Sequence, residues 1–221
     1  MTDMRHSQKT AWAGRQPISD LMHRALANPE LISLAAGFVD PVTLPAKSAK
    51  AAFDSILSDP RTAQAALQYG TTPGYTPLRQ GLLDRLVAAD SRAAGVTNLN
   101  VDQIVVTAGS NQLLHIICEA ICDPGDIILC TAPTYFVMLG TIRGVGARPI
   151  GIPTDDDGPI PAALEETLQN LAAAQELPRL KALYLVSYFD NPRGLTMPTA
   201  RREQIMEIVL RWSRQSPMYL L

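Results

Sequence analysis

Four short segments of this sequence carry side chains that could bind a flat, anionic ligand. Glycines let a backbone approach a phosphate closely, an aromatic ring can stack on a planar ligand, and an amide can both donate and accept hydrogen bonds. The segments combine these residue types with turn-forming residues, and they are Gln68-Tyr69-Gly70, Thr107-Ala108-Gly109-Ser110-Asn111, Pro133-Thr134-Tyr135 and Asn191-Pro192-Arg193-Gly194.

The segment that ends in Gly109-Ser110-Asn111 is predicted to follow a strand and to open a helix. Ser110 can cap this helix, and the N–H groups of its first turn, together with the helix dipole, favour an anion such as a phosphate. An ordinary capped helix start has the same residues. On this segment alone, both interpretations stay open.

Tyr135 and Asn191 follow two other predicted strands. A ring at Tyr135 that stacks on a planar ligand would gain about 0.5 to 1.5 kcal/mol beyond the burial of its area. Asn191 is held extended by the proline that follows it, and its amide can donate to one group while it accepts from another. The structural alternatives are a tyrosine that only packs and a turn built from Asn, Pro and Gly.

The elements that must position these residues alternate along the chain. Apolar residues at helical spacing predict leading helices over 18–28, 46–57 and 77–93. From residue 103 onwards, short apolar strands alternate with helices. Strands are predicted over 103–107, 126–131, 148–152 and 182–186, helices over 110–122, 135–143, 161–174 and 199–214, and a last apolar run covers 218–221.

This alternation predicts an α/β fold of three layers, in which helices cover both faces of a mostly parallel sheet. In open parallel sheets the ligand sits beyond the carboxyl ends of the strands. Because Ser110, Tyr135 and Asn191 each follow a strand, we expect them at one edge of the sheet. The run over 218–221 would lie at an open side, so the sheet is expected to be incomplete at the C-terminus.

The composition is that of a globular protein with small-molecule partners. The chain has 221 residues, of which 47% are hydrophobic and 18% charged, and its formal net charge is −2. Neither a nucleic-acid surface nor a membrane anchor is therefore expected. The sequence shows no apolar run of about 18 residues and no secretory signal, which predicts a cytoplasmic protein. Cys118, Cys122 and Cys130 lie in apolar segments and are interpreted as reduced core thiols.

No metal site is predicted, although two groups of residues were candidates by type. Asp155-Asp156-Asp157 is interpreted as a solvated turn, because adjacent residues of a loop rarely converge on one ion. His115, Cys118 and Cys122 share a helix face but lack a fourth ligand, so packing on the sheet is favoured. The Gly144-Val145-Gly146 segment leads from a helix into a strand, which is the wrong order for a dinucleotide fingerprint.

Taken together and in this order, the segments resemble the fold-type I pyridoxal-phosphate enzymes. The resemblance is to the class I/II aminotransferase family and to its branch of aminoadipate-type transaminases, and it covers nearly the whole chain. The matching stretches are residues 68–70 with Gly74 and Leu78-Arg79, residues 107–112, Pro124-Gly125-Asp126, Pro133-Thr134-Tyr135 and residues 191–194.

The resemblance implies a site for pyridoxal 5'-phosphate. Gly109, Ser110 and Asn111 would hold the cofactor phosphate, and Tyr135 would stack on the pyridine ring. Asn191 would hydrogen-bond the phenolic oxygen of that ring and touch the substrate carboxylate. The substrates implied are an amino acid and a 2-oxo acid.

The resemblance also implies an assembly and a division into domains. Tyr69 would reach the cofactor phosphate of a neighbouring subunit, which implies a homodimer, and Gly37 resembles the small-domain turn that approaches the substrate. Residues 1–44 would form an N-terminal arm and small-domain segment. Residues 45–221 would form the large cofactor-binding domain.

The sequence departs from the family pattern at the site itself. Asp190 and Arg193 stand where the family usually has Gln and Thr or Ser, and the turn after Gly37 lacks the usual second glycine, so substrate preference is open. The lysine that bonds the cofactor and the aspartate that pairs with its ring nitrogen are expected beyond Leu221. No catalytic residue is therefore predicted in this chain.

These expectations combine into the N-terminal part of a pyridoxal-phosphate-dependent aminotransferase, inactive on its own because the lysine must anchor the cofactor and move the proton. Its open sheet edge and exposed apolar faces predict a poorly soluble fragment. Two alternatives stay open. The same scaffold could run another amino-acid reaction, such as elimination or decarboxylation, or it could be a non-catalytic remnant that only binds.

Overall fold

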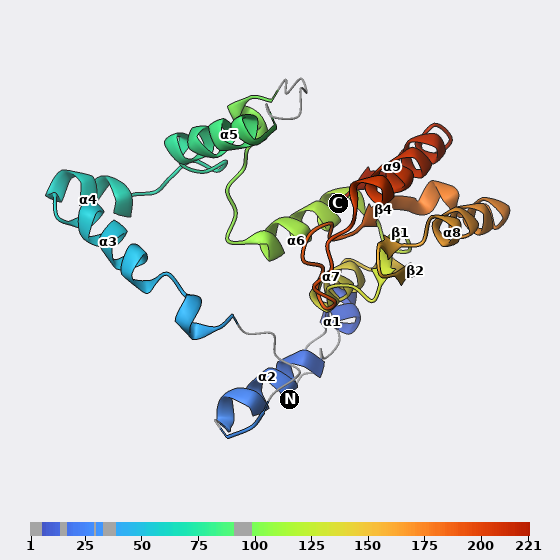
Figure 1. The fold of residues 1–221 in the computed structure, drawn as a ribbon, viewed down its shortest axis with the longest axis horizontal. Coiled ribbons are helices and arrows are strands. Elements are labelled where there is room, and N and C mark those ends of the chain that lie inside the picture. Colours follow the sequence, from blue (N-terminus) through green and yellow to red (C-terminus); the bar gives the residue numbers. More distant parts are fainter. Residues whose placement is uncertain (1–5, 14–16, 29, 33–38, 91–98) are drawn as a thin grey trace. The chain divides into compact units, whose positions relative to one another are not determined.

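The chain divides into two structural units (Figure 1). The computed structural model describes residues 6–13, 17–28, 30–32, 39–90 and 99–221. One unit, called the sheet unit below, comprises Met1–Gln16 and Ala108–Leu221, and the other, called the helical unit, comprises Pro17–Thr107. The domain boundary predicted at residue 44 stays a prediction.

The sheet unit is built on five strands in the order β3-β2-β1-β4-β5. Parallel pairs join β1 (Ile127–Ala132) to β2 (Arg148–Asp155) and to β4 (Leu180–Tyr184), and join β4 to β5 (Tyr219–Leu220). The short β3 (Gly158–Pro159) folds back antiparallel on the end of β2. The sheet is therefore mostly parallel, as the alternation of strands and helices predicted.

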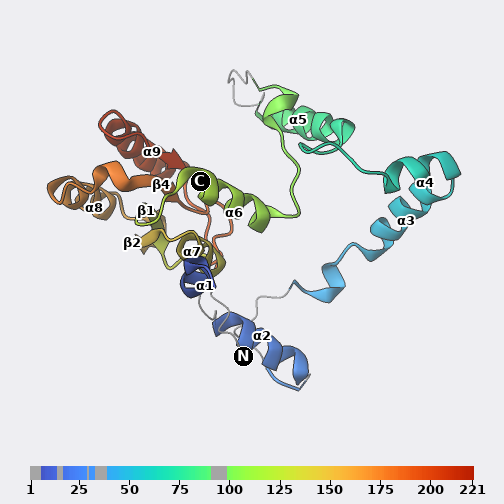
Figure 2. The same ribbon diagram turned by 180° about the vertical axis from the view of Figure 1, so that it is seen from behind.

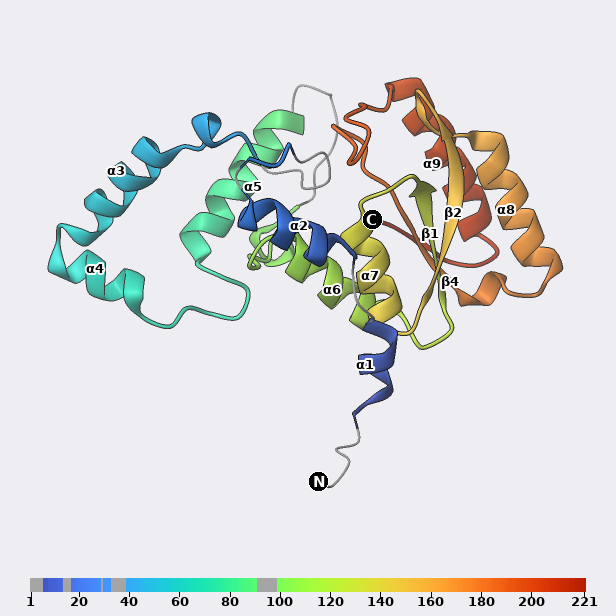
Figure 3. The ribbon, with the colours of Figure 1, turned by 90° about the horizontal axis from the view of Figure 1, so that it is seen from below.

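Helices cover both faces of this sheet, so the unit has three layers (Figure 3). One face carries α6 (Ser110–Ile121) and α7 (Phe136–Gly144), and the other carries α8 (Pro161–Ala173) and α9 (Thr199–Ser213). The short α1 (Gln8–Ala13) contacts α7, and a 3-10 turn over Leu177–Arg179 leads into β4. Helices α7, α8 and α9 lie between the parallel strands in the sequence, which parallel pairing requires.

The alternation of side chains along β1 explains why both faces need a cover. Ile127 and Leu129 join the core beneath α8 and α9, whereas Ile128 and Cys130 join the core beneath α6 and α7. Successive residues of a strand point to opposite faces, so a wholly apolar strand must be covered twice. All four side chains are at most 1% exposed.

The strand predicted over residues 103–107 was wrong. A 3-10 turn covers Val101–Gln103, and the structure shows no strand over 104–107. The backbone of this segment bonds elsewhere: Val106 N–H donates to the Pro73 carbonyl at 2.9 Å, and the Ile104 carbonyl accepts from Arg79 Nε at 2.7 Å. A strand exists only where a neighbouring strand meets its backbone groups, and sequence periodicity does not supply that neighbour.

The helical unit consists of α2 (Pro17–Ala27), α3 (Ala46–Leu57), α4 (Pro60–Leu67) and α5 (Thr76–Asp90), with a 3-10 turn over Pro41–Thr43. The helices α3 and α4 pack on each other (Figure 2). Among the described residues of this unit, only Arg79 and Leu83 are buried. Arg79 joins α5 to the turn that precedes residue 104.

Most predicted helices are confirmed to within a few residues, and α3 matches its predicted range. Two helices were missed, α1 and α4, each of eight residues or fewer. Within the described ranges, none of the helices has the length and apolar character that crossing a membrane would need.

Candidate functional site

The strand order reverses between β1 and β4, which is the point where a ligand is expected in this class of sheet. The chain moves from β1 outwards to β2, and then crosses to the other side of β1 to form β4 and β5. In open α/β sheets, ligands bind beyond the carboxyl ends of the strands at the point where the order reverses. Here those ends are Ala132 and Tyr184. This side of the sheet is called the carboxyl edge below.

The start of α6 lies at the carboxyl edge and is open for an anion. Gly109 is the residue before the helix, with φ 79° and ψ 168°, and as a glycine it offers no side chain to cap the helix. Gln112 Oε1 accepts from the Ala108 N–H at 2.6 Å, one residue earlier. The first N–H groups of a helix lack partners within the helix. Ser110 and Asn111 are exposed, and a Cβ added to Gly109 would meet no atom within 4 Å. Room and hydrogen-bond donors therefore coincide here.

Tyr135 and Asn111 are brought together by the fold. The Tyr135 hydroxyl donates to Asn111 Oδ1 at 3.2 Å, across 24 residues of sequence. Tyr135 directly precedes α7, its ring is half-buried, and it lies 5.6 Å from the Phe136 ring between centroids. The Asn111 oxygen is used in this bond, which leaves its NH₂ group to meet a ligand. An aromatic ring and the start of a helix thus share one edge of the sheet.

Asn191 lies on the loop that follows β4, on the other side of the point where the strand order reverses. Hydrogen bonds close the loop, among them Asp190 N–H to the Leu195 carbonyl at 2.8 Å, Met197 N–H to the Ser187 carbonyl at 2.9 Å, and Phe189 N–H to Thr196 Oγ1 at 3.3 Å. Asn191 is exposed near the tip. The structure shows no hydrogen bond between it and the Tyr135–Asn111 pair.

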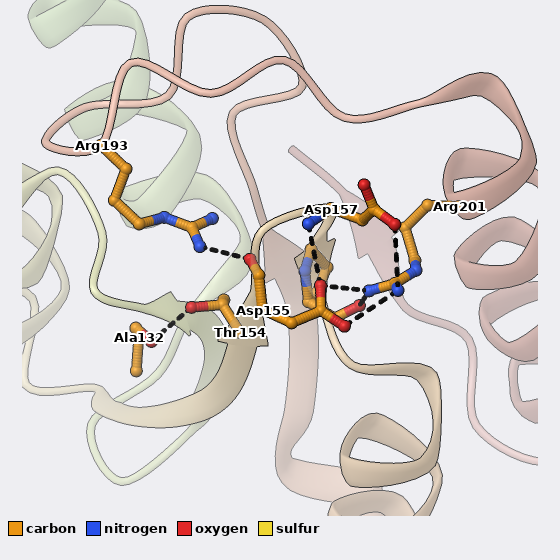
Figure 4. A network of polar contacts seen from close by, with 7 residues as sticks. Ala132, Thr154, Asp155, Asp157, Arg193 and Arg201 are labelled. Atoms are coloured by element: carbon orange, nitrogen blue, oxygen red, sulfur yellow. Dashed lines mark hydrogen bonds and ion pairs between the residues drawn. The ribbon is translucent and has the colours of Figure 1, made fainter.

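Two arginines tie the rim of this region together (Figure 4). Arg201, from the first turn of α9, donates to both carboxylate oxygens of Asp155, at 2.8 and 2.9 Å, and to the Pro159 carbonyl. Arg193 donates to the Asp155 carbonyl at 2.7 Å and to Asp190 Oδ2 at 2.9 Å. The end of β2, the Asn191 loop and α9 are therefore linked by side chains.

This linkage was not predicted from the sequence. Asp155 was assigned to a solvated turn, yet its carboxylate forms a two-point ion pair with Arg201, 46 residues away. Asp157 lies 3.8 Å from the same guanidinium. Sequence signals did mark Asp190 and Arg193 as departures from the family pattern, but they did not show that the two side chains bind each other.

Three buried oxygens near the carboxyl edge lack hydrogen-bond partners: Thr131 Oγ1, Thr134 Oγ1 and Asp190 Oδ1. Thr131 and Asp190 both line a cavity of about 10 Å³ that Arg193 also borders. This volume is about what one water molecule needs, and a buried water typically bonds to such unsatisfied groups. Polar groups left unpaired in a core are rare and are concentrated here.

Tyr184 and the core thiols remain protonated at neutral pH. Burial raises the pKa of Tyr184 to about 12, with smaller contributions from Cys130, Tyr135 and Asp190. Burial raises the pKa of Cys118 to about 11 and that of Cys130 to about 12. Within the described ranges, no group of three or more metal-ligating side chains converges on a point.

Two predicted site residues are not among those of the sheet unit described above. Tyr69 belongs to the helical unit, where its side chain is 100% exposed and its backbone N–H donates to Gln68 Oε1. Gly37 falls outside the described residues. The roles predicted for Gly109, Ser110, Asn111, Tyr135, Asn191, Tyr69 and Gly37 stay predictions.

Comparison with known proteins identifies the family. The family described as aminotransferase class I and II matches residues 29–213. The chain belongs to this family. Its members depend on pyridoxal phosphate, and the match covers most of the helical unit and most of the sheet unit.

Individual aminotransferases agree with this assignment. The chain is 34% identical over 202 residues to aromatic-amino-acid aminotransferase 1 of Thermococcus litoralis, covering 91% of this chain and 46% of that protein. It is 30% identical over 182 residues to 2-aminoadipate transaminase of Thermus thermophilus, covering 82% and 41%. The crystal structure of Pyrococcus horikoshii kynurenine aminotransferase superimposes with a TM-score of 0.83 at 31% identity, covering 97% of this chain and 50% of that one.

The chain spans about half the length of the curated relatives that it matches. The matched portion is the N-terminal one, and the α/β fold agrees with half of a fold-type I aminotransferase. The expected family and fold are thereby confirmed.

Proposed function

We propose that this chain forms the cofactor-binding part of an aminotransferase that exchanges an amino group between an amino acid and a 2-oxo acid. The observation that carries the proposal is the Tyr135–Asn111 pair at the start of α6, at the carboxyl edge where the strand order reverses between β1 and β4. It is supported by the kynurenine aminotransferase of Pyrococcus horikoshii, which was crystallised with PMP and with substrates.

The residues at the carboxyl edge fit the chemistry of pyridoxal phosphate. When bound, this cofactor supplies an electron sink for negative charge on the substrate. The N–H groups at Ser110 and Asn111, beside the open Cβ position of Gly109, would bind the phosphate dianion. The Tyr135 ring would cover one face of the pyridine, and the Asn191 amide would donate to the phenolic oxygen and meet the substrate carboxylate.

The lysines of this chain do not suit a covalent bond to the cofactor. Lys9 is paired with Glu119 at 2.7 Å, and Lys181, the second residue of β4, lies 3.4 Å from Asp126 at the amino end of the strands. Lys47 and Lys50 lie on α3 of the helical unit. We infer that the chain holds pyridoxal phosphate reversibly and does not transaminate alone.

Assembly follows the same proposal. Tyr69 is fully exposed in the helical unit, so its hydroxyl is available to another molecule. We infer that it reaches the cofactor phosphate of a second subunit in a homodimer, while the turn at Gly37 approaches the substrate. Neither role requires a contact within a single chain.

Equilibrium dialysis of the purified chain against pyridoxal phosphate tests the proposal. Saturable, reversible binding is expected, and Tyr135→Ala should raise Kd by about 2- to 10-fold, because a stacked ring is worth about 0.5 to 1.5 kcal/mol. Tyr219→Ala, which removes an exposed tyrosine from β5, is the matched control and should leave Kd unchanged.

Two outcomes would contradict parts of this proposal. Absence of saturable binding by the unaltered chain would reject the cofactor site. A pyridoxyl group fixed to one lysine by borohydride, at one per chain, would instead reject the inference that binding is reversible. In that case the labelled lysine, found by peptide mass spectrometry, would identify the true anchor.

A further inference from the structure

We propose that Asp190 and Arg193 are a positioning pair, which fixes the Asn191 turn at the carboxyl edge so that the Asn191 amide faces the cofactor. The proposal rests on the proposed function, because it assigns Asn191 a ligand there. Neither residue would touch the cofactor. Both would act through Asn191, which lies between them in the sequence.

The ion pair between Asp190 and Arg193, called the clamp below, closes the turn that contains Asn191. Arg193 Nε donates to Asp190 Oδ2 at 2.9 Å, and the two side chains are only 19% and 5% exposed. The Gly194 N–H also donates to the Asp190 carbonyl. Because the partners are three residues apart, their bond closes a small ring of chain around Asn191-Pro192. Asn191 itself remains exposed at the outside of that ring.

The clamp is anchored to the sheet. The second contact of Arg193 is the Asp155 carbonyl at the end of β2, at 2.7 Å. The Asp155 carboxylate is in turn held at two points by Arg201 of α9 (Figure 4). Planar, two-point arginine–carboxylate pairs fix orientation as well as distance. These contacts hold the Asn191 turn in place relative to β2 and α9, both of which pack into the buried core.

The backbone beside the clamp has a conformation that is unfavourable for the residue that adopts it, so surrounding contacts must hold it. Phe189 has φ 48°, a left-handed conformation that a large side chain rarely adopts, and its side chain is 80% exposed. A strained residue persists where surrounding contacts over-determine it. The exposed phenyl ring supplies no such contacts, whereas the hydrogen bonds of Phe189, Asp190 and Arg193 do.

The two substitutions relative to the family pattern make chemical sense only as a pair. A buried carboxylate without a partner is strongly unfavourable, and removing one member of a buried pair leaves the other uncompensated. An uncharged Gln at 190 with Thr at 193 avoids that cost altogether. The aspartate and the arginine therefore depend on each other, and the ion pair replaces the neutral arrangement usual in the family.

The test measures Kd for pyridoxal phosphate in a set of variants of the full chain. Asn191→Ala is expected to raise Kd by about 2- to 10-fold, the size of a lost neutral hydrogen bond. Arg193→Thr should raise it by a similar factor, and the double variant Asn191→Ala/Arg193→Thr should be no worse than Asn191→Ala. Asp190→Gln/Arg193→Thr should recover most of the affinity, because no charge is left unpaired.

Arg148→Ala, which breaks an exposed ion pair with Glu176, is the control and should leave Kd unchanged.

Amide hydrogen exchange without cofactor gives a second, independent measurement. Arg193→Thr should speed exchange at Phe189, Asp190 and Met197, whose N–H groups close the loop, while protection in β1 stays as in the unaltered chain. Equal acceleration in β1 would mean that the variant loosens the whole unit, and would overturn a specific positioning role. So would unchanged exchange in the loop.

The outcomes separate this proposal from the proposed function. If the unaltered chain binds no pyridoxal phosphate, the cofactor site and the positioning role are both rejected. If the unaltered chain binds it and Arg193→Thr leaves Kd unchanged, only the positioning role is rejected. If Arg193→Thr weakens binding further in the Asn191→Ala background, Arg193 acts on the cofactor by another route, and the positioning role is again rejected.

Discussion

At the scale of single residues, Gly109 is the position of the candidate site where a substitution is expected to strain the backbone most. Its φ of 79° is one that residues with a side chain rarely adopt, while a Cβ there would meet nothing within 4 Å. Gly109→Ala should therefore lower the free energy of unfolding through backbone strain alone, by about 1 to 3 kcal/mol. Urea denaturation monitored by circular dichroism measures this loss of unfolding free energy. Pyridoxal-phosphate binding by the variant should weaken as well.

Gly144→Ala is the matched control for that substitution. Gly144 ends α7, has an ordinary φ and also leaves open space for a Cβ, so alanine there should be neutral or slightly stabilising. If both variants lose the same stability, the effect would come from adding a methyl group to this unit and not from the conformation at Gly109.

At the scale of elements, the Asp155–Arg201 pair joins the end of β2 to the start of α9, and its strength should depend on pH. The hydrogen bonds from Arg201, aided by the Asp157 N–H, hold the pKa of Asp155 below its ordinary value of 3.8. A carboxylate with a lowered pKa stabilises the fold above its unfolded-state pKa, and that contribution disappears as the pH falls through the lowered value. Arg201→Gln should therefore cost stability at pH 5 to 7 and progressively less below about pH 4.

A second arginine, at the other end of α9, serves as the control for Arg201→Gln. Arg214, at the end of α9, is exposed, and Arg214→Gln should leave stability unchanged at each pH. Midpoints of urea unfolding between pH 3 and pH 7 give the difference from the unaltered chain. A difference for Arg201→Gln that stayed constant down to pH 3 would show that its origin is packing and not the charge of Asp155.

Elements also show which parts of the structure a sequence can predict. Helix α3 and the strands β1, β2 and β4 follow from local periodicity, and the place of Tyr135 at the carboxyl edge follows from parallel pairing. Among the described residues no strand precedes Ser110, so the hydrogen bond between Tyr135 and Asn111 is what shows that the start of α6 lies at the same edge. Helix α4 was missed although Asp59 caps it and a proline follows, which is a known start signal. The absence of the strand predicted over 103–107 and the Asp155–Arg201 pair both depend on distant partners, and no local pattern carries that information.

At the scale of the whole molecule, the two units differ in what stabilises them. The sheet unit has two cores, one on each face of the sheet, whereas α3 and α4 bury no side chain at all. Large apolar side chains of the helical unit are exposed, among them Phe53 at 65% and Leu67 at 80%. Without apolar burial, helices of 8 to 12 residues are marginal in water, since packing supplies most of their stability.

Amide hydrogen exchange at low protein concentration should therefore separate the units. Amides of β1 and β4 should exchange only by global opening of the sheet unit, while those of α3 and α4 should exchange orders of magnitude faster through local opening. Raising the concentration provides the control: if a second copy covers these helices in a homodimer, their protection should grow with concentration while that of β1 stays constant. Equal protection in both units at every concentration would contradict the argument, because it would mean that α3 and α4 are stable without a cover.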